Sequence, residues 1–413
     1  MIQISDKTKC CGCTACASVC PKKCITMQYD EEGFLYPVVD KTSCVNCGIC
    51  EKVCPFNKID KFDEHCSVYV ALQNVNEKER NESTAGGGAF SLIADALINE
   101  GAVIWAAGYD SSIRVIHKCA DNKDSLSELR GSKYVQSYLG DTFRQIQSDL
   151  KKGLTVLFVG TPCQVHGLKR ITENAQNLYK IDLLCLGVSS PKLFSKYIEY
   201  LSAKYRSRVK SVSFRDKHYG YATPNVRVDF ENGRYIQQIY DSKVHANLFF
   251  SHYNVRPCCY QCEFRECPRV SDFTIGDFND VGNFIPSMDD NKGTTRVWIH
   301  TDKGKALMEE VKKSAKVVIL DNSSSNVVGG SRKQIARPSR REEFFQDSTR
   351  FSYSDLVGKW QPYQIKGTII SVIRNIINPF PFRDALTKAI RLKKVSKFNK
   401  NVAKLNNKDE ERK

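Results

Sequence analysis

The sequence lacks a hydrophobic run of the roughly 20 apolar residues that a membrane-spanning helix needs. Its first seven residues, MIQISDK, also lack the apolar stretch of a secretory signal. These two absences argue against a membrane-embedded or secreted chain and predict a cytoplasmic one. With 413 residues, 41% of them hydrophobic, the chain is long enough for about two or three globular domains.

Cysteine, by contrast, is abundant, with 18 in the chain. Disulfide frameworks belong to small secreted domains, whereas this chain is large and its cysteines are bunched, which favours metal thiolates. The net charge of +16 is also uneven. From Lys359 to the end, 14 Lys and Arg stand against four Asp and Glu, so +10 of that charge lies in the tail. The body therefore shows no nucleic-acid footprint.

Eight cysteines form two copies of one motif, Cys-x2-Cys-x2-Cys-x3-Cys-Pro, separated by 34 residues. Three thiolates at this spacing can wrap three corners of a cubane, and the fourth ligates the other cluster in two-cluster ferredoxins. Zinc sites usually pair two CxxC motifs across a longer loop, so zinc is the weaker reading. Cys11 and Cys24 fall off the motif and are expected to be spectators. The motif predicts two [4Fe–4S] clusters, one held by Cys10, Cys13, Cys16 and Cys54, the other by Cys44, Cys47, Cys50 and Cys20.

The rest of the chain alternates helical and strand patterns. We expect a hairpin over 25–39, a helix over 89–99 and strands over 102–107, 155–159 and 179–184, with helices over 164–171 and 191–205. Beyond residue 208 an Asn-Gly turn predicts a second hairpin (226–240), followed by short strands at 273–276, 295–299 and 317–320. The predicted class is α+β, with a bacterial-type ferredoxin domain, a mixed α/β body, which the resemblance described next implies is flavin-binding, and a helical basic tail. The expected boundaries are 1–60, 66–150, 151–345 and 346–413.

The body resembles the coenzyme F420 hydrogenase/dehydrogenase beta-subunit family, some bacterial members of which lie in polysaccharide biosynthesis loci. The resemblance runs from about Cys66 to Leu320. The landmarks that carry it are Ser83–Phe90, the RGSKYVQS segment at 130–137, Gly160–Gln164, CLGV at 185–188, FRDK at 214–217, and Arg256–Asp277.

This resemblance implies FAD as the central cofactor. A glycine-rich loop entering a helix also suits a pyrophosphate, although such a loop is more often a flexible turn. Lys133 could neutralise a phosphate or be a solvated surface charge, and Asp277 could bond flavin or cap a turn. The expected cofactor-binding residues are Ser83, Thr84, Gly86, Gly87, Gly88, Ser132, Lys133, Gln136 and Asp277.

Three further cysteines, Cys259, Cys262 and Cys267, have near-cluster spacing. In the resembling family a cluster here relays electrons to the flavin, so we expect a third [4Fe–4S] cluster. Its fourth ligand is expected to be Cys185, with Cys163, at a helix start, as the alternative. A zinc site and buried, inert thiols are the other readings. For proton transfer, His218 and Tyr219 are the expected catalytic donors, although a surface or core histidine is the commoner role.

The tail has an apolar helical face between Ile365 and Ile377 and a basic run from Arg391 to Lys400. It suits a peripheral membrane contact, or equally a helix docked on the body with a solvated end. The expected function is an iron–sulfur flavoenzyme that passes electrons from a ferredoxin-like donor to a small-molecule or saccharide acceptor. The rivals are an F420H2-dependent dehydrogenase subunit, with the reduced deazaflavin as donor, and a non-catalytic electron-transfer subunit.

Overall fold

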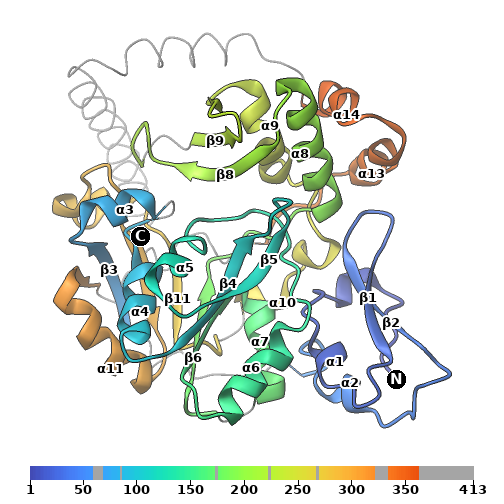
Figure 1. Ribbon diagram of the computed structural model, residues 1–413, viewed down its shortest axis with the longest axis horizontal. Coiled ribbons are helices and arrows are strands. Elements are labelled where there is room, and N and C mark those ends of the chain that lie inside the picture. Colours follow the sequence, from blue (N-terminus) through green and yellow to red (C-terminus); the bar gives the residue numbers. More distant parts are fainter. Residues whose placement is uncertain are drawn as a thin grey trace, which may run out of the picture.

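A computed structural model describes residues 1–58, 68–83, 86–172, 175–221, 225–266, 269–320 and 334–361. A small cysteine-rich module lies beside a large mixed sheet with helices on both of its faces, and a second, smaller sheet covers one end (Figure 1). The predicted α+β class, with a ferredoxin-like module ahead of a mixed α/β body, is confirmed.

The N-terminal module is built around one antiparallel hairpin, as predicted. Asp30 closes its turn, because its carboxylate accepts the backbone N–H of Phe34 at 2.8 Å. Gly33 has φ +81°, which favours glycine. The elements of the module are η1 (Lys7–Lys9), α1 (Ala15–Ser18), β1 (Ile25–Tyr29), β2 (Leu35–Val39) and α2 (Ile49–Lys52).

The large sheet has the strand order β13-β3-β12-β11-β7-β6-β4-β5. Its middle pairs, β11 with β7, β7 with β6 and β6 with β4, are parallel, and the flanking pairs are antiparallel. All five residues of β6 are buried, as expected for a central parallel strand that helices cover on both faces. The strands are β3 (Val68–Asn74), β4 (Val103–Tyr109), β5 (Val115–Ala120), β6 (Val156–Gly160), β7 (Leu178–Leu183), β11 (Phe273–Asp277), β12 (Thr295–Ile299) and β13 (Ala315–Ile319).

The helices around this sheet include those predicted over 89–99 and 164–171, which are α4 and α7 and lie near their expected positions. In Figure 1, α6 and α7 lie on the side nearer the cysteine-rich module, and α4 and α11 lie on the far side. The elements are α3 (Glu77–Glu82), α4 (Ala89–Ile98), α5 (Lys123–Ser127), α6 (Thr142–Lys151), α7 (Pro162–Thr172), η3 (Pro257–Cys259), α10 (Glu263–Glu266), η4 (Val281–Asn283), η5 (Pro286–Met288), α11 (Asp302–Val311) and η6 (Lys312–Ser314).

The smaller sheet has the order β10-β9-β8 and contains the predicted second hairpin. Its last strand ends at Gln237 and a helix begins at Tyr240, so the hairpin is shorter than the predicted 226–240. Buried residues of that helix, Val244 and Leu248, pack against the sheet and fix it as a helix. The elements are α8 (Pro191–Tyr205), β8 (Val209–Asp216), β9 (Asn225–Phe230), β10 (Tyr235–Gln237), α9 (Tyr240–Phe250), α13 (Arg341–Arg350) and α14 (Tyr353–Trp360).

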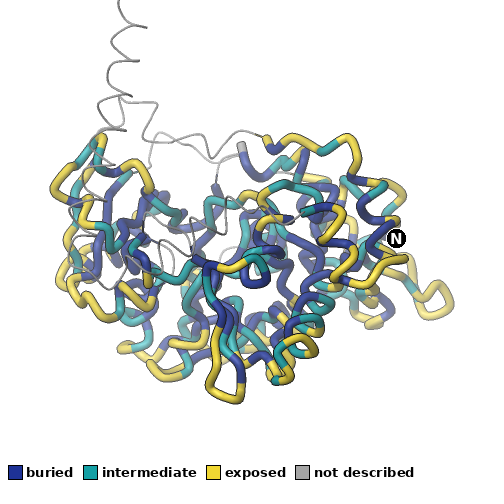
Figure 2. The backbone as a smooth tube through the Cα atoms, turned by 90° about the horizontal axis from the view of Figure 1, so that it is seen from above, coloured by how far each residue is buried: buried dark blue, intermediate teal, exposed yellow. Residues whose placement is uncertain are grey.

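The hydrophobic core joins these parts. Phe34 and Tyr36 of the β1–β2 hairpin lie in the same cluster as Phe194 of α8 and Phe345 of α13. Leu356 of α14 is fully buried in that cluster too, so the packed body reaches residue 361 although the sequence placed the start of the tail near 346. The predicted basic tail beyond it lies outside the described residues. Figure 2 shows the buried residues in the interior of the molecule and the exposed ones along its peripheral loops.

Across the part of the chain that the structure describes, no helix combines the length and apolarity needed to traverse a bilayer.

Candidate functional site

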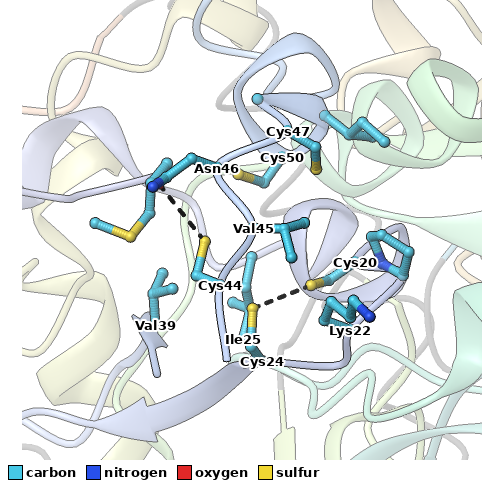
Figure 3. Close-up of a pocket in the computed structure, with 14 residues that line it drawn as sticks. Cys20, Lys22, Cys24, Ile25, Val39, Cys44, Val45, Asn46, Cys47 and Cys50 are labelled. Atoms are coloured by element: carbon cyan, nitrogen blue, oxygen red, sulfur yellow. Dashed lines mark hydrogen bonds between the residues drawn. The ribbon is translucent and has the colours of Figure 1, made fainter. Parts of the chain in front are cut away.

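Cysteines from both motifs surround a pocket at the exposed end of the module, here called the outer pocket (Figure 3). It has a volume of about 370 Å³ and also contains Lys22, Cys24, Val45 and Ile49. The Sγ atoms of Cys20 and Cys24 lie 3.4 Å apart, and the backbone N–H of Ile2 donates to Cys50 Sγ at 3.3 Å. The structure thus brings together the four cysteines that the motif assigns to one cluster, Cys20, Cys44, Cys47 and Cys50.

The other four motif cysteines, Cys10, Cys13, Cys16 and Cys54, line a second pocket of about 340 Å³, here called the inner pocket. Its lining residues belong to the module, with Phe56 and Pro37 in its wall, and Arg256 of the body approaches Cys10 Sγ to 3.7 Å. Four thiolates per pocket is the donor set of a [4Fe–4S] cluster. Among the described residues no three His, Cys, Asp or Glu side chains converge as a single-ion site. The donor set therefore fits the predicted clusters, and the assignment of each ligand stays a prediction.

The two motif copies differ sharply in their surroundings. Cys11 and Val45 occupy equivalent positions, yet Cys11 is 7% exposed and Val45 is 57% exposed. Likewise Ala15 is fully buried, whereas Ile49 is 38% exposed. The first motif copy, around Cys11 and Ala15, is buried, whereas the second copy, around Val45 and Ile49, faces solvent.

Polar contacts hold the module against the body at a surface that we call the joint. Arg256, fully buried, donates from Nε to the carbonyl of Cys10 at 2.9 Å and from a terminal nitrogen to the carbonyl of Leu35 at 2.9 Å. Gln136 donates to the carbonyl of Cys11 at 3.2 Å and accepts from Arg256 at 3.0 Å. Gln136, an expected cofactor-binding residue, thus has its amide in this joint, and its role toward the flavin stays a prediction.

A second buried arginine reinforces the joint. Arg341 of α13 forms a bidentate ion pair with Glu32 of the hairpin, at 2.8 and 2.6 Å. The same guanidinium donates to the carbonyl of Val255 at 2.8 Å and to Tyr260 Oη at 3.0 Å. Bidentate pairing fixes orientation as well as distance.

A third cysteine-lined pocket of about 590 Å³, here called the body pocket, lies on the body side of the joint. Cys163 comes from the first turn of α7, Cys185 follows β7, and Cys259 and Cys262 flank the short turn between η3 and α10. Gly187 donates its N–H to Cys185 Sγ at 3.3 Å. The structure therefore brings Cys185 to Cys259 and Cys262, as expected, and adds Cys163. Cys267 lies outside the described residues.

Cys11 also lines the body pocket, as well as the inner pocket. The spectator role expected for Cys11 stays a prediction, although the residue borders both pockets. Because Cys11 does not fit the motif spacing, its position could not be predicted from the sequence. Only the structure shows that it is buried between two pockets. The same holds for Arg256, which sequence reasoning did not single out.

The glycine-rich loop packs on the large sheet. Gly87 donates its N–H to Thr295 Oγ1 at 2.6 Å, and a Cβ on Gly87 would lie 2.1 Å from the carbonyl oxygen of Leu72. Gly88 has φ +89° at the start of α4, and Ser83 Oγ lies 3.3 Å from Ser91 Oγ. These contacts explain the glycines by close packing. Thr84 lies outside the described residues.

Basic and acidic side chains gather next to this loop. Lys217 donates to the carbonyl of Gly86 at 2.8 Å, and burial lowers the pKa of Lys217 to about 7. Arg215 pairs with Asp277 at 2.8 Å, and burial nonetheless raises the pKa of Asp277. Arg215 and Ser132 both contact the Tyr134 hydroxyl. Predicted residues Gly86, Ser132 and Asp277 thus belong to one half-buried, polar region.

Lys133 and the expected proton donors are placed differently. Lys133 Nζ donates to three backbone carbonyls, those of residues 129, 130 and 131, at 3.0 to 3.4 Å, and burial lowers the Lys133 pKa to about 7. Its three hydrogens are therefore used by its own loop. His218 is exposed just after β8, and its ring lies 4.8 Å from the buried ring of Tyr219. Their catalytic role stays a prediction.

Comparisons with known proteins agree with this division of the chain. Residues 9–58 match the 4Fe-4S dicluster domain, and residues 153–324 match the family defined by the C terminus of the beta subunit of coenzyme F420 hydrogenase/dehydrogenase. No curated protein matches the chain. A chain in the solved F420-reducing [NiFe] hydrogenase complex from Methanosarcina barkeri, derivatised with xenon, is similar at 16% identity and a TM-score of 0.45, covering 74% of this chain and 94% of that one. The predicted resemblance is confirmed by the two family matches.

Proposed function

Because the chain joins a 4Fe–4S dicluster domain to the C-terminal domain of the coenzyme F420 hydrogenase/dehydrogenase beta-subunit family, we propose that it is an iron–sulfur flavoprotein oxidoreductase. Its proposed reaction passes electrons from a low-potential donor through [4Fe–4S] clusters to FAD and on to an organic acceptor. The observation that carries the proposal is the row of three cysteine-lined pockets, outer, inner and body, of which the last two share Cys11.

The different surroundings of the three pockets would set the direction of electron transfer through them. The outer pocket has an exposed rim of Val45 and Ile49, where a protein donor can approach. The inner pocket lies next to the joint, because Arg256 approaches Cys10 Sγ to 3.7 Å, and Phe56 borders both the inner and the body pocket. When bound, the clusters would carry single electrons, and FAD would convert them to two-electron chemistry.

For the body pocket, we propose Cys163, Cys185, Cys259 and Cys262 as the ligands of a third cluster. These four thiols line one pocket, and Cys267, which lies outside the described residues, stays the expected alternative to Cys163. Gly187 N–H and the Thr161 hydroxyl, which lies 3.2 Å from Cys163 Sγ, would stabilise thiolates there.

FAD would bind in the polar region beside the glycine-rich loop. The donor set fits an anionic cofactor: Arg215, Lys217 and Arg296 are at least half buried near Gly86 and Asp277, and Arg296 Nε is buried without a hydrogen-bond partner among the described residues. Arg215 and Lys217 would hold the phosphates or the ring, and the Arg215–Asp277 pair would fix their orientation. Coenzyme F420 as the hydride partner and a saccharide as the acceptor are the alternatives to be tested beside it.

The test is anaerobic purification of the full chain with iron, sulfide and flavin assays. About twelve irons with one FAD per chain support the proposal, and about eight irons without flavin contradict it. Cys163→Ser and Cys267→Ser then form a matched pair for the body pocket. We expect Cys163→Ser to lose about four irons and Cys267→Ser to keep the full content. The reverse pattern would show that Cys267 is a ligand and Cys163 is not.

The rival functions separate in the same preparations. Reduction of coenzyme F420, or oxidation of its reduced form, by the isolated chain would favour the F420-dependent reading. A loaded chain that accepts electrons from dithionite but reduces none of the small acceptors tested would favour a non-catalytic electron-transfer subunit.

A further inference from the structure

Arg256 is a buried cation at the inner pocket. Its side chain is fully buried, and its guanidinium lies 4.2 Å from the centre of the Tyr36 ring. Its closest hydrogen-bond partners are the neutral oxygens of Cys10, Leu35 and Gln136. A guanidinium stays protonated in proteins, and burying a charge is costly unless an opposite charge compensates it.

The group that can compensate it is a ligated thiolate. A terminal nitrogen of Arg256 lies 3.7 Å from Cys10 Sγ, a predicted cluster ligand. Arg256 also lines the body pocket, so its charge lies between the cysteines of the inner pocket and those of the body pocket. The position therefore fits a cation built to sit against an anionic cluster.

The outer pocket has no equivalent among the residues that the structure describes. Cys44 corresponds to Cys10 in the second motif, and its Sγ lies 3.8 Å from the amide oxygen of the exposed Asn46. Two cations line the outer pocket, the exposed Lys22 and the Met1 ammonium, which pairs with Glu51 at 3.0 Å. Water and salt screen both of them, and the Glu51 carboxylate balances the second. The two motif copies thus share a ligand set and differ in buried charge.

We propose that Arg256 is a positioning charge that holds the reduction potential of the inner cluster above that of the outer cluster, which biases electrons toward the body. The inference rests on the proposed function, since it requires both clusters. Net charge, hydrogen bonds to sulfur and exposure set the potential of an iron–sulfur cluster. Reduction adds one negative charge, and an unscreened cation beside Cys10 stabilises that reduced form.

The experiment is a potentiometric titration of the anaerobic full chain followed by EPR. Arg256→Gln removes the charge, and Arg256→Lys keeps it. Arg341→Gln is the matched control, because it removes another buried arginine of the joint whose charge is already balanced by Glu32. Cys47→Ser removes a predicted ligand of the outer cluster and so identifies the outer signal by its change.

We expect Arg256→Gln to lower the equilibrium constant for reduction of the inner cluster at least tenfold, which is about 59 mV for one electron. The outer signal should not move, and Arg256→Lys and Arg341→Gln should leave the inner potential near that of the wild type. Equal shifts in Arg256→Gln and Arg341→Gln would mean that loosening the joint, rather than the charge, matters, and would overturn the inference.

A second measurement needs no change at Arg256. In a chain whose body-pocket signal has been removed with Cys163→Ser, the signal that Cys47→Ser leaves unchanged must titrate at a higher potential than the signal that Cys47→Ser alters. A lower potential for the inner cluster overturns the inference even if Arg256→Gln does not fold. If the clusters load normally but the potential of the inner cluster does not change in Arg256→Gln, only this inference is refuted. If the chain holds no clusters, the proposed function is refuted.

Discussion

Gly167 gives the sharpest test of how the module meets the body. It lies within α7, and a Cβ at this position would be 2.8 Å from Cys13 Sγ and 3.1 Å from Cys13 Cβ. Cys13 is 7% exposed and is a predicted cluster ligand, so it has little room to move. We therefore expect Gly167→Ala to push the helix and the inner pocket apart.

The magnitude follows from two opposing effects. Replacing Gly by Ala inside a helix stabilises by about 1 kcal/mol, whereas overpacking a close contact costs about 1–3 kcal/mol. Gly167→Ala should thus lower the free energy of unfolding by up to about 2 kcal/mol. Gly358 of α14 is the matched control, because no heavy atom lies within 4 Å of its added Cβ. Gly358→Ala should gain up to about 1 kcal/mol.

The assay is anaerobic denaturant unfolding of both variants, with iron content and EPR of the reduced clusters. Gly167→Ala should be less stable than Gly358→Ala and should disturb one of the two module signals. The reasoning is refuted if both substitutions stabilise the chain equally and both signals keep their shape, since α7 would then not press on the inner pocket.

Two further predictions concern the body. Burial lowers the pKa of His245 from 6.5 to about 3, so folded and unfolded chains bind protons alike above pH 6.5 and the unfolded chain binds more below it. Stability should fall by about 2 kcal/mol between pH 6.5 and 5, and His245→Gln should flatten this part of a plot of melting temperature against pH; an unchanged slope would contradict it. Gly87→Ala places a Cβ 2.1 Å from a rigid backbone carbonyl, that of Leu72, and should cost more than about 3 kcal/mol in denaturant unfolding, whereas a near-neutral effect would show that the loop can move.

Local patterns predicted much of the fold. Alternating and continuous apolar runs located six of the eight strands of the large sheet, all except β3 and β5, because burial on one or two faces imposes those periods. The Asn-Gly turn located the hairpin of the smaller sheet. The second hairpin strand was extended too far, to Tyr240, because its aromatic and apolar residues suit a strand as well as a buried helix. The order of the eight strands was not predictable, since it depends on contacts between distant segments.

The candidate site divides in the same way. The grouping of the eight module cysteines could be read from spacing alone, because a cubane imposes it. Arg256 and Cys11 could not, since their position depends on how the body folds against the module, and neither belongs to a motif. The contact of Gln136 with Arg256 could not be predicted for the same reason, and the expected flavin-binding role of Gln136 stays a prediction.

The Arg341–Glu32 pair and the shared core around Phe34 and Phe345 have a consequence for kinetics. A carrier domain on a free tether must swing between donor and acceptor, and its hop rate then depends on solvent viscosity. Here Arg256 and Arg341, both buried, hold the module against the body, so packing fixes the spacing between the proposed redox centres. Internal transfer should be insensitive to glycerol, which leaves encounter with the external donor as the viscosity-dependent step.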